Sequence, residues 1–329
     1  MRRRDFIKGV VGSASAWPIA ARAQQQSTVP VVGVVIGGSL DASASGLTAF
    51  RDGLNEGGYV EGKDVTVEHH ALEGHFDRLP ALMDDLVRRR VAVIATPGSS
   101  AAAVAAKAAT AIIPIAFAVG EDPVRLGLVT NLARPGGNAT GVNFFVQEVL
   151  AKRLRLLHDL APKAVRVAVL VNPTNPLVAQ PTLRAVEEAA PAIGLQTQIL
   201  NATTAAEIDA AFETIARERP DALFVAADAF FVSRRVQIVT LAARNGIPAS
   251  YATGDTVAAG GLMSYGTDPA DMYRQVGLYT SKILKGAKPA DLPVTQLTKF
   301  AFVLNLQTAR ALGIEVPPAV LSIADEVIE

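Results

Sequence analysis

The feature that most constrains the fold of this chain is a regular alternation of short apolar runs with amphipathic helix patterns. In the first half, runs rich in β-branched residues are followed by segments in which apolar residues recur every three or four positions. The predicted strands are Val29–Gly37, Val65–His70, Val91–Thr96 and Ile112–Val119, and the predicted helices between them are Ser43–Gly57, Arg78–Arg90 and Ser99–Thr110. This order predicts a parallel, doubly wound sheet.

The same alternation starts again after the proline- and glycine-rich loop Arg134–Asn138. The second series predicts helices over Gln147–Leu160, Leu177–Ile193, Ala205–Arg217 and Ser233–Asn245, and strands over Val165–Val171, Gln196–Leu200, Ala222–Ala226 and Ile247–Tyr251. The two series repeat an architecture without detectable sequence identity. Each has about the size of a domain, which predicts two α/β lobes that face one another.

The last part of the chain is too short for a third domain. It predicts strands at Gly261–Gly266 and Leu297–Leu304 and helices at Pro269–Leu284 and Thr308–Gly313. We expect three crossings between the lobes, which would form a three-strand hinge near Thr140–Phe144, Gly260–Tyr265 and Val294–Phe300. The expected boundaries are 29–141 plus about 265–293 for lobe 1, and 142–264 plus about 297–329 for lobe 2.

Residues 1–23 have the pattern of a cleaved export signal. The basic segment Arg2–Lys8 precedes a modestly apolar stretch, Val10–Ala20, which ends in the small-residue motif Ala21–Ala23. The stretch is too short to span a bilayer. The basic segment resembles the twin-arginine signal, although Arg2 stands where that pattern usually has Ser or Thr; a basic amphipathic helix is the alternative. The signal predicts an exported, soluble periplasmic protein, and the lack of cysteine predicts that it has no lipid anchor.

Charge and cysteine content disfavour several classes of protein. The chain has 31 basic and 31 acidic residues, and removal of residues 1–23 leaves 26 basic against 30 acidic residues, so the mature part is mildly acidic. No basic segment suited to nucleic acid is visible. Without cysteine, a disulfide framework, a thiolate metal site and a catalytic thiol are excluded. Aromatic residues make up only 5% of the chain, which disfavours an aromatic ligand.

No enzymatic motif with a suitable context is present. The glycines of Gly33–Gly38 lack the spacing of a dinucleotide-binding turn, and no P-loop lysine follows a glycine cluster. His69 and His70 are adjacent, so on a strand they point to opposite faces, which favours surface histidines over a metal site. Ser99 and its neighbour lack the G-x-S-x-G elbow of serine hydrolases. We expect no catalytic residue, metal or cofactor.

Polar residues at the ends of the predicted strands are the candidate ligand contacts, because open α/β sheets bind ligands there. The hydroxyl and N–H groups of Thr96–Ser100, at the start of a helix, suit a carboxylate, although Ser99 is equally an N-cap. Asp122 and Asp228 would each accept hydrogen bonds from an ammonium group or cap a turn. Asn172 and Tyr251 end further strands.

Several segments, in one order along the chain, carry a resemblance to a known family. They are Asp122–Val124, Gly127–Val129, Asn131–Gly141, Gly261–Gly266, Ile283–Pro293 and Ala324–Glu329. The chain resembles the ABC-transporter substrate-binding proteins, a family that includes tryptophan/tyrosine-binding members. The resemblance implies a type I periplasmic-binding-protein fold whose two lobes close on a solute and deliver it to a membrane permease with an ATPase partner.

The resemblance also implies site residues. The implied first-lobe contacts are Ser39, Thr96, Gly98, Ser99, Ser100 and Asp122, and the implied second-lobe contacts are Asn143, Asn172, Asp228, Tyr251 and, beside the hinge, Tyr265. The Thr96–Ser100 loop would hold a carboxylate, and an acidic side chain an ammonium group. Apolar walls would come from Phe144, Tyr251 and one of Phe230 and Phe231, since neighbouring side chains rarely face the same way.

The expected function is capture of an amino acid or another small carboxylate-bearing compound for an ABC import system, by a monomer without a nucleic-acid partner. A ligand-binding sensor for a membrane receptor would have the same sequence features. A two-lobed α/β enzyme, such as a glycosyltransferase or an epimerase, would share the lobes but require nucleotide contacts and a cytoplasmic location.

Overall fold

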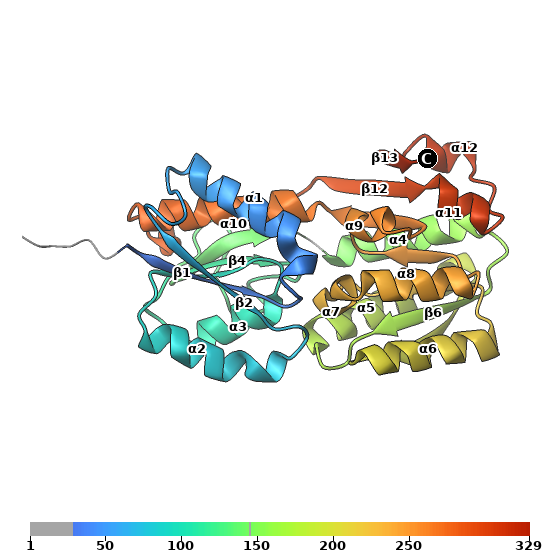
Figure 1. The fold of residues 1–329 in the computed structure, drawn as a ribbon, viewed down its shortest axis with the longest axis horizontal. Coiled ribbons are helices and arrows are strands. Elements are labelled where there is room, and N and C mark those ends of the chain that lie inside the picture. Colours follow the sequence, from blue (N-terminus) through green and yellow to red (C-terminus); the bar gives the residue numbers. More distant parts are fainter. Residues whose placement is uncertain (1–28, 145) are drawn as a thin grey trace, which may run out of the picture.

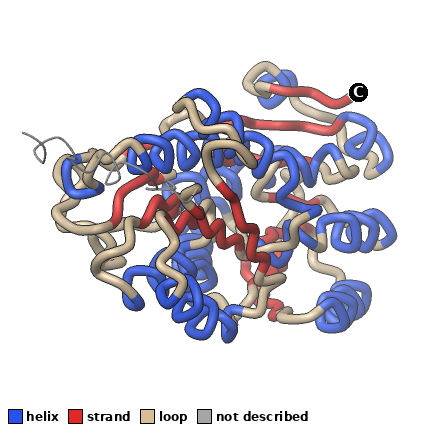
Figure 2. Tube along the Cα trace, turned by 60° about the vertical axis from the view of Figure 1, so that its left-hand side comes forward, coloured by secondary structure: helices blue, strands red, loops and turns tan. Residues whose placement is uncertain are grey.

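The computed structural model describes residues 29–144 and 146–329, so the predicted export signal lies outside the described residues. These residues form two α/β lobes that lie side by side along the long axis of the molecule (Figure 1). In each lobe a central sheet is flanked by helices, as Figure 2 shows with strands in red and helices in blue. The predicted fold class, two mainly parallel α/β lobes, is confirmed.

Lobe 1 has a six-stranded sheet in the order β11-β5-β4-β3-β1-β2, and all its pairings are parallel. Its strands are β1 (Val31–Ile36), β2 (Thr66–Ala71), β3 (Val93–Thr96), β4 (Ile115–Val119), β5 (Ala139–Asn143) and β11 (Thr295–Gln296). Its helices are α1 (Ala44–Glu56), α2 (Leu79–Arg88), α3 (Ser100–Ala109) and α10 (Pro269–Leu284). The two-residue β11 is too short to give a sequence signal.

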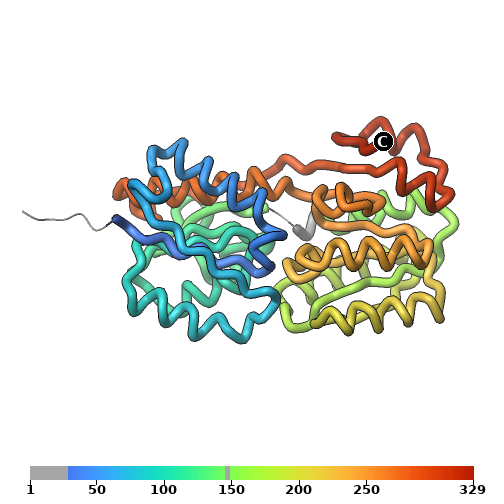
Figure 3. Tube along the Cα trace, viewed as in Figure 1, coloured from blue at the N-terminus to red at the C-terminus, as the bar shows by residue number. Residues whose placement is uncertain are grey.

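The continuous apolar runs of lobe 1 reflect burial on both faces of the sheet. In β1, Val32 and Val34 belong to the core cluster shared with α1 and α10, whereas Val35 belongs to the cluster shared with α2 and α3. Successive side chains of a strand point to opposite faces, so every position must be apolar when helices cover both. Figure 3 shows α10, from late in the sequence, lying beside α1 in this lobe.

Lobe 2 has a seven-stranded sheet in the order β13-β12-β10-β9-β8-β6-β7. Its strands are β6 (Arg166–Val171), β7 (Gln196–Asn201), β8 (Ala222–Val225), β9 (Ala249–Tyr251), β10 (Met263–Thr267), β12 (Phe300–Asn305) and β13 (Glu326–Ile328). Its helices are α4 (Val146–Leu160), α5 (Pro176–Ala189), α6 (Ala205–Glu218), α7 (Ala229–Ser233), α8 (Arg235–Arg244), α9 (Gly254–Ala258), α11 (Leu306–Ala311) and α12 (Pro318–Leu321). Within the described ranges, only β10 and β12 pair antiparallel.

The chain passes between the lobes at three neighbouring points. Leu297 N donates to Asn143 O at 2.9 Å, and Thr267 Oγ1 donates to Phe144 O at 3.3 Å, so the three crossings are joined to one another. The second crossing follows β10, near Asp268, a few residues later than the sequence predicted. The reason is that β10 continues to Thr267 by pairing with β12. The exact lobe boundaries stay a prediction.

Helices of the described residues are all too short or too polar to span a bilayer.

Short elements such as α7, α9, α12 and β13 have no predicted counterpart, because a few residues do not establish a period.

Candidate functional site

A cavity of about 160 Å³ lies between the two lobes and is lined by both. Lobe 1 contributes the loops after β1 and β3 and the start of α1, and lobe 2 contributes the loops after β8 and β9 with parts of α4 and β10. The carboxyl ends of strands from two sheets therefore meet where such sheets bind ligands. Since an apolar cavity of about 150 Å³ holds a benzene-sized molecule, the cleft has room for a small organic ligand.

The loop after β1 touches helix α7 of the opposite lobe. A Cβ on Gly38 would lie 2.7 Å from Ser233 Oγ and 3.0 Å from the carbonyl oxygen of Ala229, so a larger residue would displace Ser233 Oγ and press on the α7 backbone. Ser39 N donates to Ser233 Oγ at 2.9 Å across the cleft. Ser39, a predicted contact, thus joins the lobes through its backbone and is not among the cavity-lining residues.

The loop after β3 uses most of its hydroxyl groups within the protein. Ser99 Oγ accepts a hydrogen bond from Ala102 N at 3.3 Å, the N-cap alternative raised by the sequence. Ser100 Oγ donates to the carboxylate of Glu121. Thr96 Oγ1 is buried and lacks a partner among the described residues. Gly98, with a φ of +73°, lines the cavity.

Glu121 makes this loop a poor place for a carboxylate. It lines a smaller pocket of about 40 Å³ beside the main cavity, together with Ser99, Ser100 and Asn175. Burial raises the pKa of Glu121, and the hydrogen bond from Ser100 opposes that rise. An acidic side chain next to the loop disfavours a second carboxylate, so the structure gives no support for the expected carboxylate site at 96–100.

Two other predicted residues have structural partners away from the cavity. Asp122 is exposed, and its Oδ1 accepts from Val124 N at 2.8 Å, which is the turn-capping alternative. Asn143 Nδ2 donates to Val119 O at 3.0 Å and to Glu121 O at 2.7 Å. Neither side chain belongs to the cavity lining, and the structure does not bring Asp122 together with Asp228.

Asp228 does line the cavity and is 1% exposed. Its carboxylate accepts hydrogen bonds from Phe230 N at 2.9 Å, Asn175 Nδ2 at 2.8 Å and Asn172 Nδ2 at 3.2 Å. Burial raises the pKa of Asp228, while these three donors act in the opposite direction. Asn172 therefore positions Asp228 and does not itself line the cavity. The remaining acceptor capacity of the carboxylate suits a ligand donor.

The predicted aromatic walls divide between the cavity and the core. Phe144 and Tyr265 line the cavity, and Lys152 Nζ lies 4.4 Å from the centre of the Tyr265 ring. Phe230 and Phe231 are both buried in the lobe 2 core and do not line the cavity. Both side chains therefore pack inside, in agreement with the expectation that at least one of them does.

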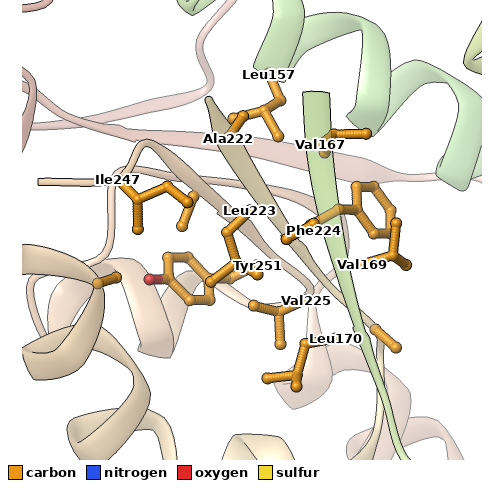
Figure 4. Close-up of a cluster of buried hydrophobic side chains, with 14 of the residues drawn as sticks. Leu157, Val167, Val169, Leu170, Ala222, Leu223, Phe224, Val225, Ile247 and Tyr251 are labelled. Carbon is orange, nitrogen blue, oxygen red and sulfur yellow. The ribbon is translucent and has the colours of Figure 1, made fainter. Parts of the chain in front are cut away.

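The Tyr251 ring lies on the face of the lobe 2 sheet that is opposite to Phe224 (Figure 4). Figure 4 shows its ring on the same side as Leu223 and Ile247, with Phe224 on the opposite side. It lines two other pockets and not the cleft, so the structure does not support its predicted role as a cleft wall. A strand end predicts nearness to the cleft, but the face depends on register.

Several cavity-lining residues were not predicted from the sequence, among them Asp255, Tyr273 and Arg153, and Arg153 is the one whose charge is buried. It lies in α4, is 1% exposed, and donates from Nη2 to Val225 O at 2.7 Å. A signal was available: Leu150, Leu154 and Leu157 form the inward stripe of α4, and Arg153 occupies a position within that stripe. A charged residue at an inward helix position is rare without a partner.

Metal binding has no basis in the described part of the chain, where no group of three or more His, Asp or Glu side chains is arranged to hold an ion. His69 and His70 lie on β2 and do not line the cavity.

A family model described as ABC transporter substrate binding protein matches residues 28–328. A tyrosine-binding protein of Clostridioides difficile (strain R20291) is 26% identical over 295 residues, which cover 89% of this chain and 82% of that protein. Two solved structures, each 26% identical, match 91% of this chain and 99% of theirs. One, the ABC domain from Streptococcus pneumoniae in complex with L-Trp, has a TM-score of 0.78.

The other is the ligand-free, open structure of a substrate binding protein with adhesive properties from Clostridium difficile, with a TM-score of 0.62. Identity and coverage are the same in both comparisons, and the TM-score is higher with the liganded structure than with the ligand-free, open one.

Proposed function

This chain belongs to the ABC transporter substrate binding protein family, and from that premise we propose that it captures an amino acid or another small carboxylate-bearing compound between its lobes. As a member of the family it is a substrate-binding component and not an enzyme, and its partners are a small molecule and the ABC transporter. The observation that carries the proposal is the cavity between the lobes, which combines apolar walls with the buried carboxylate of Asp228.

Capture depends on closure of the lobes about the three crossings. A ligand that touches both lobes stabilises the closed form, because only that form offers all its contacts. Closure removes water from Asp228 and strengthens its interaction with a ligand ammonium group. The tyrosine-binding relative and the L-Trp-bound structure support an amino acid as the ligand class.

A thermal-shift screen of amino acids and small organic acids, followed by calorimetry, tests this function. A ligand present at about 100 times its Kd stabilises the native state by about 2.7 kcal/mol. We expect stabilisation by at least one amino acid or organic acid. No hit from any chemical class would count against solute capture.

For amine-bearing ligands, Asp228→Asn should weaken binding more than about tenfold, because a hydrogen bond between charged groups contributes about 1.5–3 kcal/mol. Asp122→Asn, at an exposed turn, is the matched control and should leave the affinity unchanged. Equal affinities of the two variants would contradict the ammonium site at Asp228.

We also propose that residues 1–23 direct export through the twin-arginine route and that the mature protein acts as a soluble periplasmic monomer without a lipid anchor. The basic and apolar order of the segment and the absence of cysteine support this. Mass spectrometry of the purified periplasmic protein should give an N-terminus near Gln24, and light scattering a single chain. Retention in the cytoplasm at full length would contradict the export proposal.

A further inference from the structure

The most unusual group in the cleft is the guanidinium of Arg153. It is almost completely buried, it lines the cavity, and it lies over the ring of Phe224 with Cζ 4.0 Å from the ring centre. Its Nε is buried without a hydrogen-bond partner among the residues that the structure describes. The one hydrogen bond it makes there goes to the neutral carbonyl oxygen of Val225.

Among the described side chains, Arg153 has no acidic partner either. Between residues 29 and 329, the acidic side chains whose positions are described form no ion pair with Arg153. Asp228 and Asp255 line the same cavity; Asp228 accepts hydrogen bonds from two asparagines and a backbone N–H, and neither carboxylate pairs with Arg153 among the described contacts. Burial lowers the pKa of Arg153 to about 9, so the side chain stays a cation at neutral pH.

A buried charge without a partner is strongly unfavourable, and such groups are normally paired. The surrounding residues offer apolar packing and one carbonyl, which leave the unpaired side of the guanidinium available for an anion. Arg also presents a planar fork of donors that matches a carboxylate.

We infer that Arg153 is the specificity-determining residue of the cleft, and that it selects ligands that carry a carboxylate on an apolar body. This rests on the proposed capture function and gives it a substrate class. It also moves the carboxylate subsite from the loop after β3, where the sequence placed it, to helix α4 of the opposite lobe. Asp228 is then left for an ammonium group when the ligand has one.

Matched ligand pairs test the inference. The probes are L-tyrosine and 3-(4-hydroxyphenyl)propanoate, which carry a carboxylate, against tyramine and L-tyrosinamide, which do not, together with a set of other small acids and their amides. We expect the wild-type protein to be stabilised only by acids. Arg153→Met should weaken the binding of those acids about 100-fold or more, as removal of one member of a buried charge pair does.

Arg155→Met is the matched control, because Arg155 lies on the same helix, has the same side chain, is exposed and is not among the cavity-lining residues. It should leave acid binding within about threefold. Arg153→Lys keeps the charge but loses the planar fork, so its affinity should lie between those of the wild type and Arg153→Met.

The thermal stability of the ligand-free variants separates binding from a structural role. Loss of a lone buried cation should leave the melting temperature of Arg153→Met unchanged or raised. A lower melting temperature with acid preference retained would overturn the inference and assign Arg153 to packing. If amines or amides bind and Arg153→Met does not weaken their binding, the inference about Arg153 is also overturned. The proposed solute capture would stand in that case. A protein that no acid, amine or amide stabilises would overturn solute capture itself.

Discussion

Among single residues, some polar groups at the cleft are used within the protein, whereas others line the cavity. Ser99 and Asp122 have the side-chain types of ligand contacts, but local N–H groups use their oxygens as caps. Asp228 also caps a helix, yet it still faces the cavity. A capping residue at a helix start can therefore also line the cavity, and membership of the cavity lining is what separates Asp228 from Ser99 and Asp122.

Glu121 should make the stability of the protein depend on pH. Burial raises its pKa in the folded state, so the folded state binds more protons than the unfolded state. The free energy of unfolding should then fall as pH rises from the ordinary value of about 4.5 through the folded pKa. Glu121→Gln keeps an acceptor for Ser100 and removes the charge, so its stability should change less with pH over that interval.

Urea denaturation of both proteins between about pH 4 and 7 measures this slope. Glu213→Gln, at an exposed site on α6, is the control and should retain the wild-type slope. An equal slope in Glu121→Gln would show that Glu121 does not contribute.

At the scale of elements, α1 and α10 make the closest helix contact in lobe 1. A Cβ on Gly53 would lie 2.1 Å from Arg274 O, and a Cβ on Gly277 would lie 2.2 Å from Phe50 O. The two backbones therefore touch through glycines. This contact holds the late helix α10 to the N-terminal lobe and so positions Met272 and Tyr273 at the cleft.

Gly277→Ala should have two opposite effects on the stability of the α1–α10 contact. Helix propensity favours Ala over Gly by about 1 kcal/mol. Backbone overlap favours Gly, since overpacking costs about 1–3 kcal/mol and more when backbone must move. We expect a lower melting temperature for Gly277→Ala, measured by calorimetry. Thr48→Ala, on the exposed side of α1, should not lower it, and a more stable Gly277→Ala would disprove the close contact.

At the scale of the whole molecule, the crossings and the lobe contact define a closed arrangement. The loop after β1 meets α7 through Gly38 and Ser233, and the three crossings are joined through Asn143, Phe144 and Thr267. Closure about this hinge brings Arg153 and Asp228 of lobe 2 against lobe 1 residues that are distant in sequence.

Gly38→Ala tests this arrangement. Its Cβ would overlap Ser233 Oγ only when the lobes meet, so the open form should be unaffected and ligand affinity should fall about tenfold or more. Small-angle scattering with saturating ligand should show a larger radius of gyration than in the wild type. Ser233→Ala removes one hydrogen bond, about 1 kcal/mol, and should lower affinity about fivefold. Wild-type scattering and affinity for Gly38→Ala would contradict the closed contact.

Much of the fold and part of the site were predictable from the sequence. The long strands and helices were found because burial on one or two faces leaves a period in the apolar residues. Some of the shortest elements, such as β11 and α7, leave no period. Among the site residues, Asp228, Gly98 and Tyr265 line the cavity as the strand-end rule and the family resemblance implied, whereas Arg153 was missed because its helix was taken as packing alone.

Two α/β lobes, the order of their elements and the strand ends that form the cleft are predictable from the sequence, because these depend on local periodicity and chain direction. Which side chains line the cavity depends on contacts between elements that are distant in the chain. Tyr251 is turned away by the register of its sheet, and Arg153 is turned inward among leucines. The cleft exists only where loops more than 100 residues apart meet, as Ser39 and Ser233 do, and local sequence carries no record of that contact.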